Sequence, residues 1–115
     1  MRRGEIRLVD LDPVRGAEAD QRRPGIIVSN DGANSTAERL RRGVITVVPV
    51  TSNTTRVYPF QVLLPASETG LQRDAKAQAE QLRSVAVERI GARLGVVTGE
   101  LLVALDDALR LHLAL

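Results

Sequence analysis

The sequence predicts a mostly β domain with one or more helices packed on it, and three observations lead to that prediction. Several short segments are rich in β-branched residues or alternate between apolar and polar side chains, as strands do. The C-terminal segment repeats leucine at the three- and four-residue spacing of a helix. A chain of 115 residues can bury a core but is too short for two domains, so we expect one domain over residues 1–115.

The N-terminal segment is predicted to be a strand followed by a long loop. Residues 4–13, GEIRLVDLDP, alternate between two faces, which predicts a half-buried strand ending in a turn at Asp12 and Pro13. Residues 14–23, VRGAEADQRR, carry charge and no apolar period, which predicts a long exposed loop. Long loops in compact domains are usually functional or mobile.

A second strand and a short helix are predicted next. Residues 24–30, PGIIVSN, form the strand, and Pro24 suits its first position because proline cannot donate to a strand ladder. The polar segment DGANSTAERLRRG that follows predicts a short helix, capped by Ser35 or Asn34 and stopped by Gly43.

The middle of the chain contains two clear strands and one ambiguous segment. Residues 44–50, VITVVPV, form a continuous β-branched run, which predicts a third strand buried on both faces. After the polar loop TSNTTR, residues 58–65, YPFQVLLP, predict a fourth strand closed by proline. Residues 70–91 are rich in alanine, glutamate, glutamine and arginine, so intrinsic propensity alone predicts a helix there.

The C-terminal segment is predicted to be an amphipathic helix that begins after Thr98 and Gly99 and lies on the strands. Its charged residues occupy the side opposite the leucines. His112, the only histidine, is expected to be solvated near the helix end, where a cation is favoured, rather than catalytic. The leucines that define the apolar side are Leu101, Leu102, Leu105, Leu109 and Leu113.

Composition excludes several classes of site. The chain has no cysteine and one histidine, so thiolate nucleophiles, disulfides, cysteine-ligated zinc, nucleophilic triads and histidine-based metal sites are all excluded. The glycines match neither a dinucleotide fingerprint nor a phosphate-binding loop. Asp10 and Asp12 could flank a cation, but this spacing at a strand end is more often turn chemistry. We therefore expect no metal and no cofactor.

Targeting signals are also missing from the sequence. The N-terminus, MRRGEIRLVDLD, lacks the apolar core of a signal peptide, and the longest apolar runs are too short to cross a bilayer. We expect a cytoplasmic protein without a membrane partner.

The basic residues are almost all arginine. Of the sixteen, only Lys76 is lysine, and the net charge at neutral pH is +2 although the sequence pI is about 9.9. Arginine does not titrate until very high pH, so the pI overstates the charge at neutrality. An arginine excess is consistent with a polyanionic partner and equally with a GC-rich genome, so charge alone leaves both interpretations open.

Arginines, hydroxyls and carboxylates in loops are sufficient for one reaction class. RNA carries its own nucleophile, the 2′-hydroxyl, so a cleaving protein needs only to position the backbone, stabilise the pentacoordinate phosphate and move protons. The loop ending at Pro24 offers Glu18 and Arg23, and the loop after the third strand offers Thr51 and Ser52. If the second and third strands are neighbours, both loops can face one groove.

Three motifs occur in order along the chain: D-L-D-P-x-x-G-x-E, R-P-x-x-x-x-S-N and V-P-V-T-S. They lie in the segments RRGEIRLVDLDPVRGAEADQRRPGIIVSND and VITVVPVTSN, which are followed by YPFQVLLP and by GL ahead of EQLRSVAVERIG. With these motifs the chain resembles the MazF/PemK (Kid) family of bacterial toxin endoribonucleases over nearly its whole length. The resemblance implies an SH3-like β-barrel with a C-terminal amphipathic helix.

The resemblance also implies an activity and partners. The family is homodimeric, cleaves single-stranded RNA at short sequences without a metal, and is neutralised by an antitoxin, here a MazE-like one. The expected target is messenger RNA, with ribosomal or transfer RNA as further candidates. By the same resemblance, strand is expected around residues 75–80, and strand with a short helical turn around 82–88, against the helical propensity of this segment.

Site residues follow from matching the motifs position by position. The matches imply catalytic roles for Arg23, Thr51 and Glu18, and RNA-binding roles for Arg22, Ser52, Asn53 and Arg15. Competing interpretations stand beside three of these. Glu18 is equally well a loop carboxylate without a special duty, and the Thr51 hydroxyl could cap its own turn. For Arg22, a solvated charge without a function is favoured over a residue that steers RNA.

The sequence departs from the family pattern in its aromatic content. Tyr58 and Phe60 are the only aromatic residues, so stacking of RNA bases on rings is nearly unavailable and arginine planes would have to substitute. Ala17 stands where the family often has serine. The first alternative function is a non-enzymatic toxin on the same fold that inhibits a protein target such as DNA gyrase, although such a protein has no use for a phosphate clamp. The second is an RNA-binding module that does not cleave.

Overall fold

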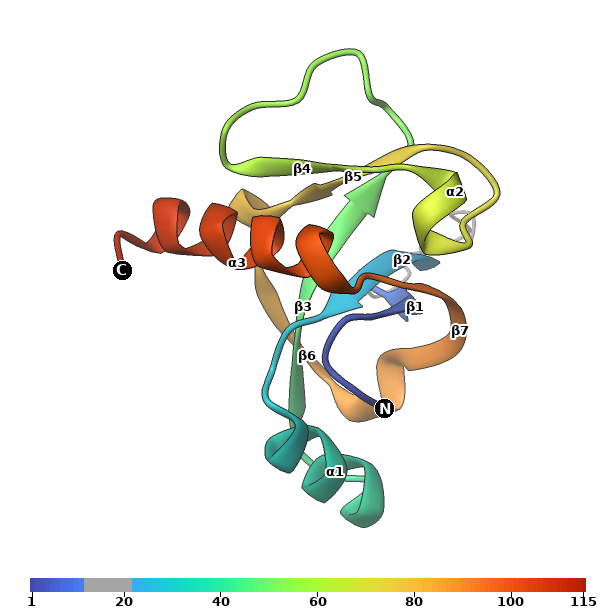
Figure 1. Ribbon diagram of the computed structural model, residues 1–115. Coiled ribbons are helices and arrows are strands. Elements are labelled where there is room, and N and C mark those ends of the chain that lie inside the picture. Colours follow the sequence, from blue (N-terminus) through green and yellow to red (C-terminus); the bar gives the residue numbers. More distant parts are fainter. Residues whose placement is uncertain (12–21) are drawn as a thin grey trace, which may run out of the picture.

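A computed structural model describes residues 1–11 and 22–115 of the chain (Figure 1). Its strands form one antiparallel sheet in the order β4-β5-β3-β2-β1-β7, and β6 also pairs with β3. The strands are β1 Glu5–Asp10, β2 Arg22–Ile27, β3 Val44–Thr51, β4 Gln61–Leu64, β5 Ala75–Gln78, β6 Arg83–Ala86 and β7 Ile90–Val96. The helices are α1 Asp31–Leu40, α2 Ala66–Thr69 and α3 Gly99–Leu113, with 3₁₀ turns η1 Ala79–Gln81 and η2 Val87–Arg89.

Strand β3 organises the sheet because both of its edges are paired. One edge meets β2, and the other is shared by β6, opposite residues 44–47, and β5, opposite Val50 and Thr51. Strands β4 and β7 end the strand order, and the described pairings do not join them. The sheet is therefore an open version of the predicted SH3-like barrel, and the mostly β fold with a C-terminal helix is confirmed.

The larger apolar core lies between the sheet and α3. Leu105 of α3 is buried against it, as predicted from the leucine spacing, and so is Ala108, whereas Leu113 near the helix end is exposed. His112 is also exposed, as predicted. Buried residues of this core include Ile6, Ile26, Val48, Leu64, Ala77 and Val97.

A second apolar cluster packs beside α1. It contains Val9, Leu11, Ile27, Ala37, Ile45, Val47, Val85 and Val87. The first strand was predicted to be half-buried, but Ile6 and Val9 are both fully buried, so apolar residues cover it on both faces. The prediction that the third strand is buried on both faces is confirmed, since residues 47–50 are all buried.

Helix α1 begins one turn earlier than the sequence suggested. Its N-cap is Asn30, whose side chain accepts a hydrogen bond from the backbone N–H of Ala33 at 2.8 Å. The predicted caps were wrong: Asn34 is buried inside the helix and Ser35 is exposed there. The helix ends at Arg41 in a left-handed conformation, with Gly43 just beyond it at a φ of 102°.

The segment after β4 departs most from local propensity. The helix predicted over residues 70–91 is wrong, and β5, η1, β6 and η2 occupy it instead, as the family resemblance implied. Strand β3 offers an open edge to this segment, and Ala75 and Ala77 are buried against it. Pairing and burial outweigh the small helical preference of alanine and glutamine.

Other boundaries also differ from the predictions. The fourth strand is shorter than predicted, because Tyr58 and Gln61 close a turn ahead of β4 in which the N–H of Gln61 donates to the Tyr58 carbonyl at 2.8 Å. Strand β7 and the short helix α2 were not predicted. No helix in the described part of the chain is long and apolar enough to cross a membrane.

Candidate active site

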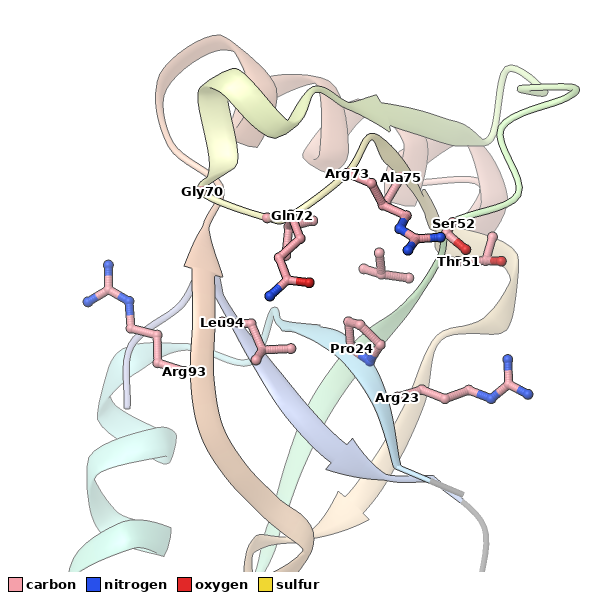
Figure 2. A pocket seen from close by; sticks show the side chains of 12 residues that line it. Arg23, Pro24, Thr51, Ser52, Gly70, Gln72, Arg73, Ala75, Arg93 and Leu94 are labelled. Carbon is pink, nitrogen blue, oxygen red and sulfur yellow. The ribbon is translucent and has the colours of Figure 1, made fainter. Parts of the chain in front are cut away.

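A groove with a volume of about 580 Å³ opens between the C-terminal end of β3, the start of β2 and the segment that joins α2 to β5 (Figure 2). Strand β7 forms its opposite wall. The lining residues are Arg23, Pro24, Val50, Thr51, Ser52, Gly70, Leu71, Gln72, Arg73, Ala75, Arg93 and Leu94. Three of these are arginines, and none of the described lining residues is acidic, so the groove favours an anionic ligand.

Arg23 and Thr51 meet at this groove because of the strand register. Strands β2 and β3 are neighbours, with Gly25 opposite Pro49. Continuing that register by two residues places Arg23 opposite Thr51, and opposed residues in an antiparallel pair point to the same face. The ladder itself stops at Gly25, so the two side chains flank the mouth of the groove. This confirms the expected proximity of the second strand and the loop after the third.

Arg23 is an exposed residue near the start of β2. It lies opposite Val9 of β1, and Pro24 follows it opposite Leu8, so the backbone beside it is held by β1. Within the part of the chain that the structure describes, its guanidinium has no hydrogen-bond acceptor and no ion-pair partner. Its paired donors are therefore available to a phosphate.

Thr51 is the last residue of β3 and is partly buried. Its Oγ1 accepts a hydrogen bond from the N–H of Asn53 at 3.3 Å, so the hydroxyl does cap its own turn, as one interpretation held. A hydroxyl that accepts one bond still has its own proton to donate. The capping contact thus orients the hydroxyl and leaves it able to donate to an oxygen in the groove.

The remaining predicted RNA-binding residues separate into three groups. Ser52 is exposed and lines the groove. Asn53 does not line it, and its Oδ1 accepts from the N–H of Thr55 at 3.2 Å within the loop. Arg22 lies opposite Asp10, engages in a contact of its own and does not line the groove. Glu18 and Arg15 lie outside the described residues.

Sequence reasoning missed Arg73, which lies in the connection between α2 and β5. It is exposed, has no hydrogen-bond or ion-pair partner among the described residues, and in Figure 2 its guanidinium is directed toward Ser52 and Thr51. Propensity placed this residue in a helix, so its position in a groove-lining connection was hidden. No charge pattern marked it, because the run GLQRD holds one arginine and one aspartate and has no net charge.

The far wall of the groove depends on close packing of β7 against α2. A Cβ added at Gly95 would come within 2.3 Å of the Thr69 carbonyl oxygen, so only glycine fits there without displacing the backbone. Arg93 extends from this wall and, as Figure 2 shows, points away from the groove centre. Its Nη1 lies 3.8 Å from Oε2 of Glu5, so it is partly engaged in the protein's own structure.

No cluster of three or more histidine, aspartate or glutamate side chains suited to a metal ion occurs within the described residues. What the groove does assemble is a set of arginine and hydroxyl donors around an open volume. Such donors can hold a phosphate and stabilise charge that develops on it.

Comparison with known proteins identifies the relatives of this chain. Residues 2–113 match the family described as PemK-like, MazF-like toxin of type II toxin–antitoxin system. The chain is 65% identical over 115 residues to endoribonuclease MazF9 of Mycobacterium tuberculosis, covering 100% of this chain and 98% of that protein.

Solved structures give the same result. The fold resembles a crystal structure of MazF from Deinococcus radiodurans with a TM-score of 0.77 at 26% identity, covering 100% of this chain and 97% of that one. It also resembles a mycobacterial endoribonuclease solved with its cognate antitoxin, with a TM-score of 0.75 at 25% identity, covering 100% and 96% of the two chains.

Proposed function

This chain belongs to the PemK-like, MazF-like family of toxins of type II toxin–antitoxin systems and is an endoribonuclease. We propose that it cleaves single-stranded RNA at the groove flanked by Arg23 and Thr51. The observation that carries the proposal is the pair itself. An arginine without an internal partner and an oriented hydroxyl lie on opposite sides of a groove whose described lining holds no acidic residue.

The proposed reaction uses the 2′-hydroxyl of the RNA as nucleophile. Its oxygen attacks the adjacent phosphorus, the bond from phosphorus to the 5′-oxygen of the next nucleotide breaks, and the products carry 2′,3′-cyclic phosphate and 5′-hydroxyl ends. The proton of the 2′-hydroxyl goes to a base, for which we propose Glu18, and a proton is supplied to the departing 5′-oxygen. The reaction needs no metal ion.

Arg23 supplies the main electrostatic stabilisation in this scheme. The scissile phosphodiester carries one negative charge in the ground state, and attack adds a second, so donors that meet the extra charge act mainly on the transition state. The Thr51 hydroxyl donates to the same phosphate, and Arg73, whose guanidinium is directed toward Ser52 and Thr51, adds a second cation there. Ser52, Asn53, Arg22 and Arg15 are proposed to bind the flanking RNA.

The cellular role follows from the family. We propose a sequence-specific toxin that cuts messenger RNA in the cytoplasm, inhibits translation and growth, and is neutralised by a MazE-like antitoxin. The solved mycobacterial relative in complex with its cognate antitoxin supports that partner. Inhibition of a protein target such as gyrase would leave the arginine groove without a use.

We also propose that the working form is a two-fold homodimer with RNA lying across the interface. The groove of one protomer is small compared with several nucleotides, so a second protomer would add RNA-binding surface. Sedimentation at micromolar concentration should show a dimer, and monomer alone would contradict the proposal.

The experiment that tests the function is incubation of the protein with single-stranded RNA in EDTA, followed by mapping of the cut ends. We expect cleavage at a short recurrent sequence. Each cut should create a new 5′-hydroxyl end, which a polynucleotide kinase can phosphorylate. Strict dependence on added magnesium, or products with 5′-phosphate ends, would contradict the mechanism.

A further inference from the structure

The loop of residues 52–60 joins β3 to β4 and arches outward beyond β4 (Figure 1). Thr51, Lys76 and Leu63 are register partners across β3, β5 and β4, so their side chains point to one face. The preceding pair, Val50 and Ala77, points to the other face and is buried in the core under α3. Lys76 therefore lies beside Thr51 on the face away from α3.

Lys76 ties this loop to the sheet. Its Nζ donates to the carbonyl oxygen of Arg56 at 2.6 Å, and the residue is only 8% exposed although it faces outward. No carboxylate lies within ion-pair distance of it among the described residues. A nearly buried ammonium needs its hydrogen bonds, so this contact holds the loop backbone in place beside the groove.

A second anchor fixes the far end of the loop. The N–H of Tyr58 donates to Oε1 of Gln61 at 3.1 Å, and the N–H of Gln61 donates back to the Tyr58 carbonyl at 2.8 Å. Gln61 is buried, and its Nε2 donates to Oε2 of Glu80 at 2.6 Å. Pro59 restricts the backbone of Tyr58 further. The loop is thus ordered before any ligand binds.

The loop displays both aromatic rings of the chain together with a cation. Tyr58 and Phe60 are parallel to within 5°, with ring centroids 5.4 Å apart. Nη1 of Arg56 donates to the Tyr58 hydroxyl at 3.1 Å, and the guanidinium carbon lies 5.6 Å from the ring centre, so the cation sits nearer the hydroxyl end. Tyr58 is 42% exposed, so part of the ring surface is open to solvent.

We propose that Arg56, Tyr58 and Phe60 form a nucleobase-stacking subsite for RNA that extends from the cleavage groove. The inference rests on the proposed function and adds a second point of contact to it. Aromatic rings with an adjacent arginine bind bases in a sequence-tolerant way, because every base has a flat π face. The loop begins at Ser52, a lining residue of the groove, so a strand whose phosphate lies between Arg23 and Thr51 has its flanking nucleotides beside this loop.

RNA is favoured over a protein segment as the occupant for two reasons. The subsite offers stacked flat rings and a guanidinium, which match a base and its phosphate, rather than an apolar groove that would take a helix. It is also continuous, through the loop, with a groove whose charged side chains are all arginine. Sequence reasoning expected ring stacking to be nearly absent, and the structure instead brings the only two rings together.

The sequence provides a direct reporter for this subsite. Tyr58 is the only tyrosine and the chain has no tryptophan, so intrinsic tyrosine emission reports this residue alone. The probe is the single-stranded RNA defined by mapped cut ends, blocked by a 2′-O-methyl group at the nucleotide that supplies the attacking hydroxyl. We expect tyrosine emission to be quenched in step with binding, measured in parallel by anisotropy of the labelled RNA.

Variants separate stacking from loop structure. Tyr58→Ala should weaken RNA binding by about 5-fold to 150-fold, the usual effect of losing one stacked base, and raise KM with little change in single-turnover kcat. Tyr58→Phe keeps the ring and should retain most of the affinity, whereas Tyr58→Leu keeps apolar bulk and should not. Val57→Ala, at an exposed neighbour without a ring, is the matched control and should change neither quenching nor affinity.

The outcomes distinguish this inference from the proposed function. In one outcome the wild-type protein cuts RNA, while RNA binding leaves its tyrosine emission unchanged and Tyr58→Ala binds RNA with wild-type affinity. That result would overturn the subsite and leave the groove chemistry in place. If Tyr58→Ala binds RNA normally but escapes neutralisation by the antitoxin, the surface binds protein and the inference is overturned. If the wild-type protein neither binds nor cuts single-stranded RNA, both proposals fail together.

Discussion

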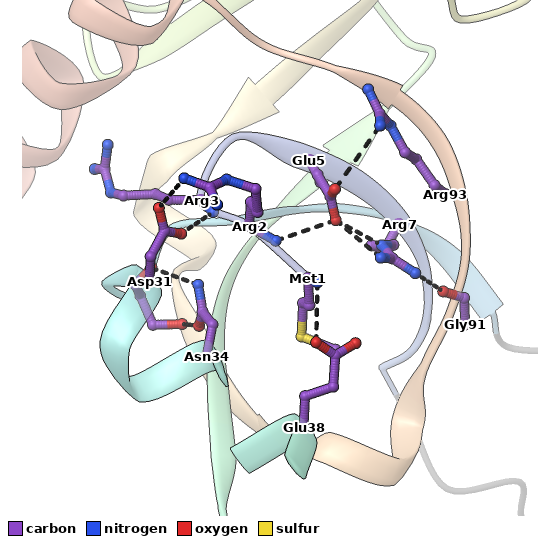
Figure 3. Close-up of polar contacts among 11 residues, drawn as sticks. Met1, Arg2, Arg3, Glu5, Arg7, Asp31, Asn34, Glu38, Gly91 and Arg93 are labelled. Carbon is purple, nitrogen blue, oxygen red and sulfur yellow. Dashed lines mark hydrogen bonds and ion pairs between the residues drawn. The ribbon is translucent and has the colours of Figure 1, made fainter. Parts of the chain in front are cut away.

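Two groups of arginines in the described part of this protein have opposite surroundings. Around the N-terminus, Arg3 and Arg7 have their donors filled by acceptors from the protein itself (Figure 3). At the groove, Arg23 and Arg73 have no such acceptors among the described residues (Figure 2). Arginines in the two groups therefore have different roles, because the fold places hydrogen-bond acceptors beside one group and not beside the other.

The N-terminal group joins distant parts of the fold. Nε and Nη2 of Arg7 donate to Oε1 of Glu5 at 3.0 and 2.9 Å, and Nη1 donates to the Gly91 carbonyl of β7 at 3.0 Å. Nε of Arg3 donates to the Val28 carbonyl at 2.9 Å, and Nη2 donates to Asp106 of α3 at 2.6 Å. These bonds hold β1 to β7 and hold the residues before β1 to α3.

The amino terminus itself belongs to the same group. Its ammonium donates to Oε1 of Glu38 on α1 at 3.0 Å, and the backbone N–H of Arg3 donates to Asp31 at the start of that helix at 2.6 Å. The hydrogen bond from the Arg3 N–H to the half-buried Asp31 carboxyl is the main reason that the pKa of Asp31 lies below its ordinary value. An arginine whose donors are all hydrogen-bonded within the protein is therefore structural, whereas an arginine beside a groove whose donors have no partner is available to bind an anion.

The largest expected effect is at Arg23. Arg23→Ala should lower the single-turnover cleavage rate by about a hundredfold to a thousandfold, because it removes a donor that acts on the transition state. Arg23→Lys should not restore the rate, since lysine keeps the charge but loses the paired donors. Arg2→Ala, at an exposed arginine of the N-terminal group, is the control and should cut at the wild-type rate. Full activity in Arg23→Ala would place the chemistry elsewhere.

Thr51 should have the next largest effect. Thr51→Ala removes a neutral donor to a charged group, a contact worth about 1.5 to 3 kcal/mol, which corresponds to roughly tenfold to a hundredfold in rate. Thr51→Ser keeps the hydroxyl and should retain most of the activity. A rate for Thr51→Ala equal to that of Thr51→Ser would show that the hydroxyl serves only its turn. Single-turnover cleavage of the mapped RNA measures both variants.

In the N-terminal group, substitution should affect stability and leave cleavage unchanged. Glu5→Gln removes the charge that accepts two bonds from Arg7 and should lower the free energy of unfolding by about 1.5 to 3 kcal/mol. Chemical denaturation measures this loss, and cleavage per folded molecule should stay at the wild-type value. A large loss of cleavage in Glu5→Gln without a loss of stability would show that the N-terminal group also takes part in cleavage.

The same carboxylate gives a pH dependence with a defined sign. Burial raises the pKa of Glu5, but the hydrogen bonds from Arg7 and from the N–H of Arg2, with the charges of Arg7 and the amino terminus, outweigh it and leave the pKa below its ordinary value. The ionised carboxylate therefore stabilises the fold above its ordinary pKa, and this contribution is lost as the pH falls through the lowered value. The stability gap between the wild type and Glu5→Gln should narrow over that acidic range. A gap that stays constant there would show that Glu5 does not titrate with folding.

The smallest expected effect concerns the salt dependence of RNA binding. The logarithm of the affinity should fall with the logarithm of the salt concentration by about 0.7 per phosphate neutralised. Arg73→Ala should reduce this slope by about that amount. Arg110→Ala, whose guanidinium is already paired with Asp107 on α3, should leave the slope unchanged. Equal slopes for the two variants would show that Arg73 does not contact phosphate.

The sequence predicts the strands and the C-terminal helix well where periodicity and burial agree. The β-branched run at residues 44–50 and the leucine spacing of α3 both correspond to buried faces of the structure. Propensity alone predicts helix around Ala75 to Val85, whereas the strands there pair with β3 residues that lie 25 to 42 positions earlier in the chain. Single-sequence propensity contains no information about that partner.

The candidate site was predicted in part for a similar reason. Arg23 and Thr51 lie beside strand motifs that the sequence displays, so their meeting follows once β2 and β3 are neighbours. Arg73 reaches the groove through the connection between α2 and β5, which only the three-dimensional arrangement reveals. The stacking of Tyr58 on Phe60 likewise depends on a loop conformation fixed by Lys76 and Gln61.

The central claim is that the groove arginines, and not the N-terminal ones, bind the RNA backbone. The most direct test is an NMR spectrum of the arginine side-chain Nε–H groups, recorded as cleavage-blocked single-stranded RNA is added and assigned with single-arginine variants. The signals of Arg23 and Arg73 should shift until binding saturates, while those of Arg3 and Arg7 stay in place. Shifts confined to Arg3 and Arg7, with Arg23 unmoved at saturation, would contradict the claim.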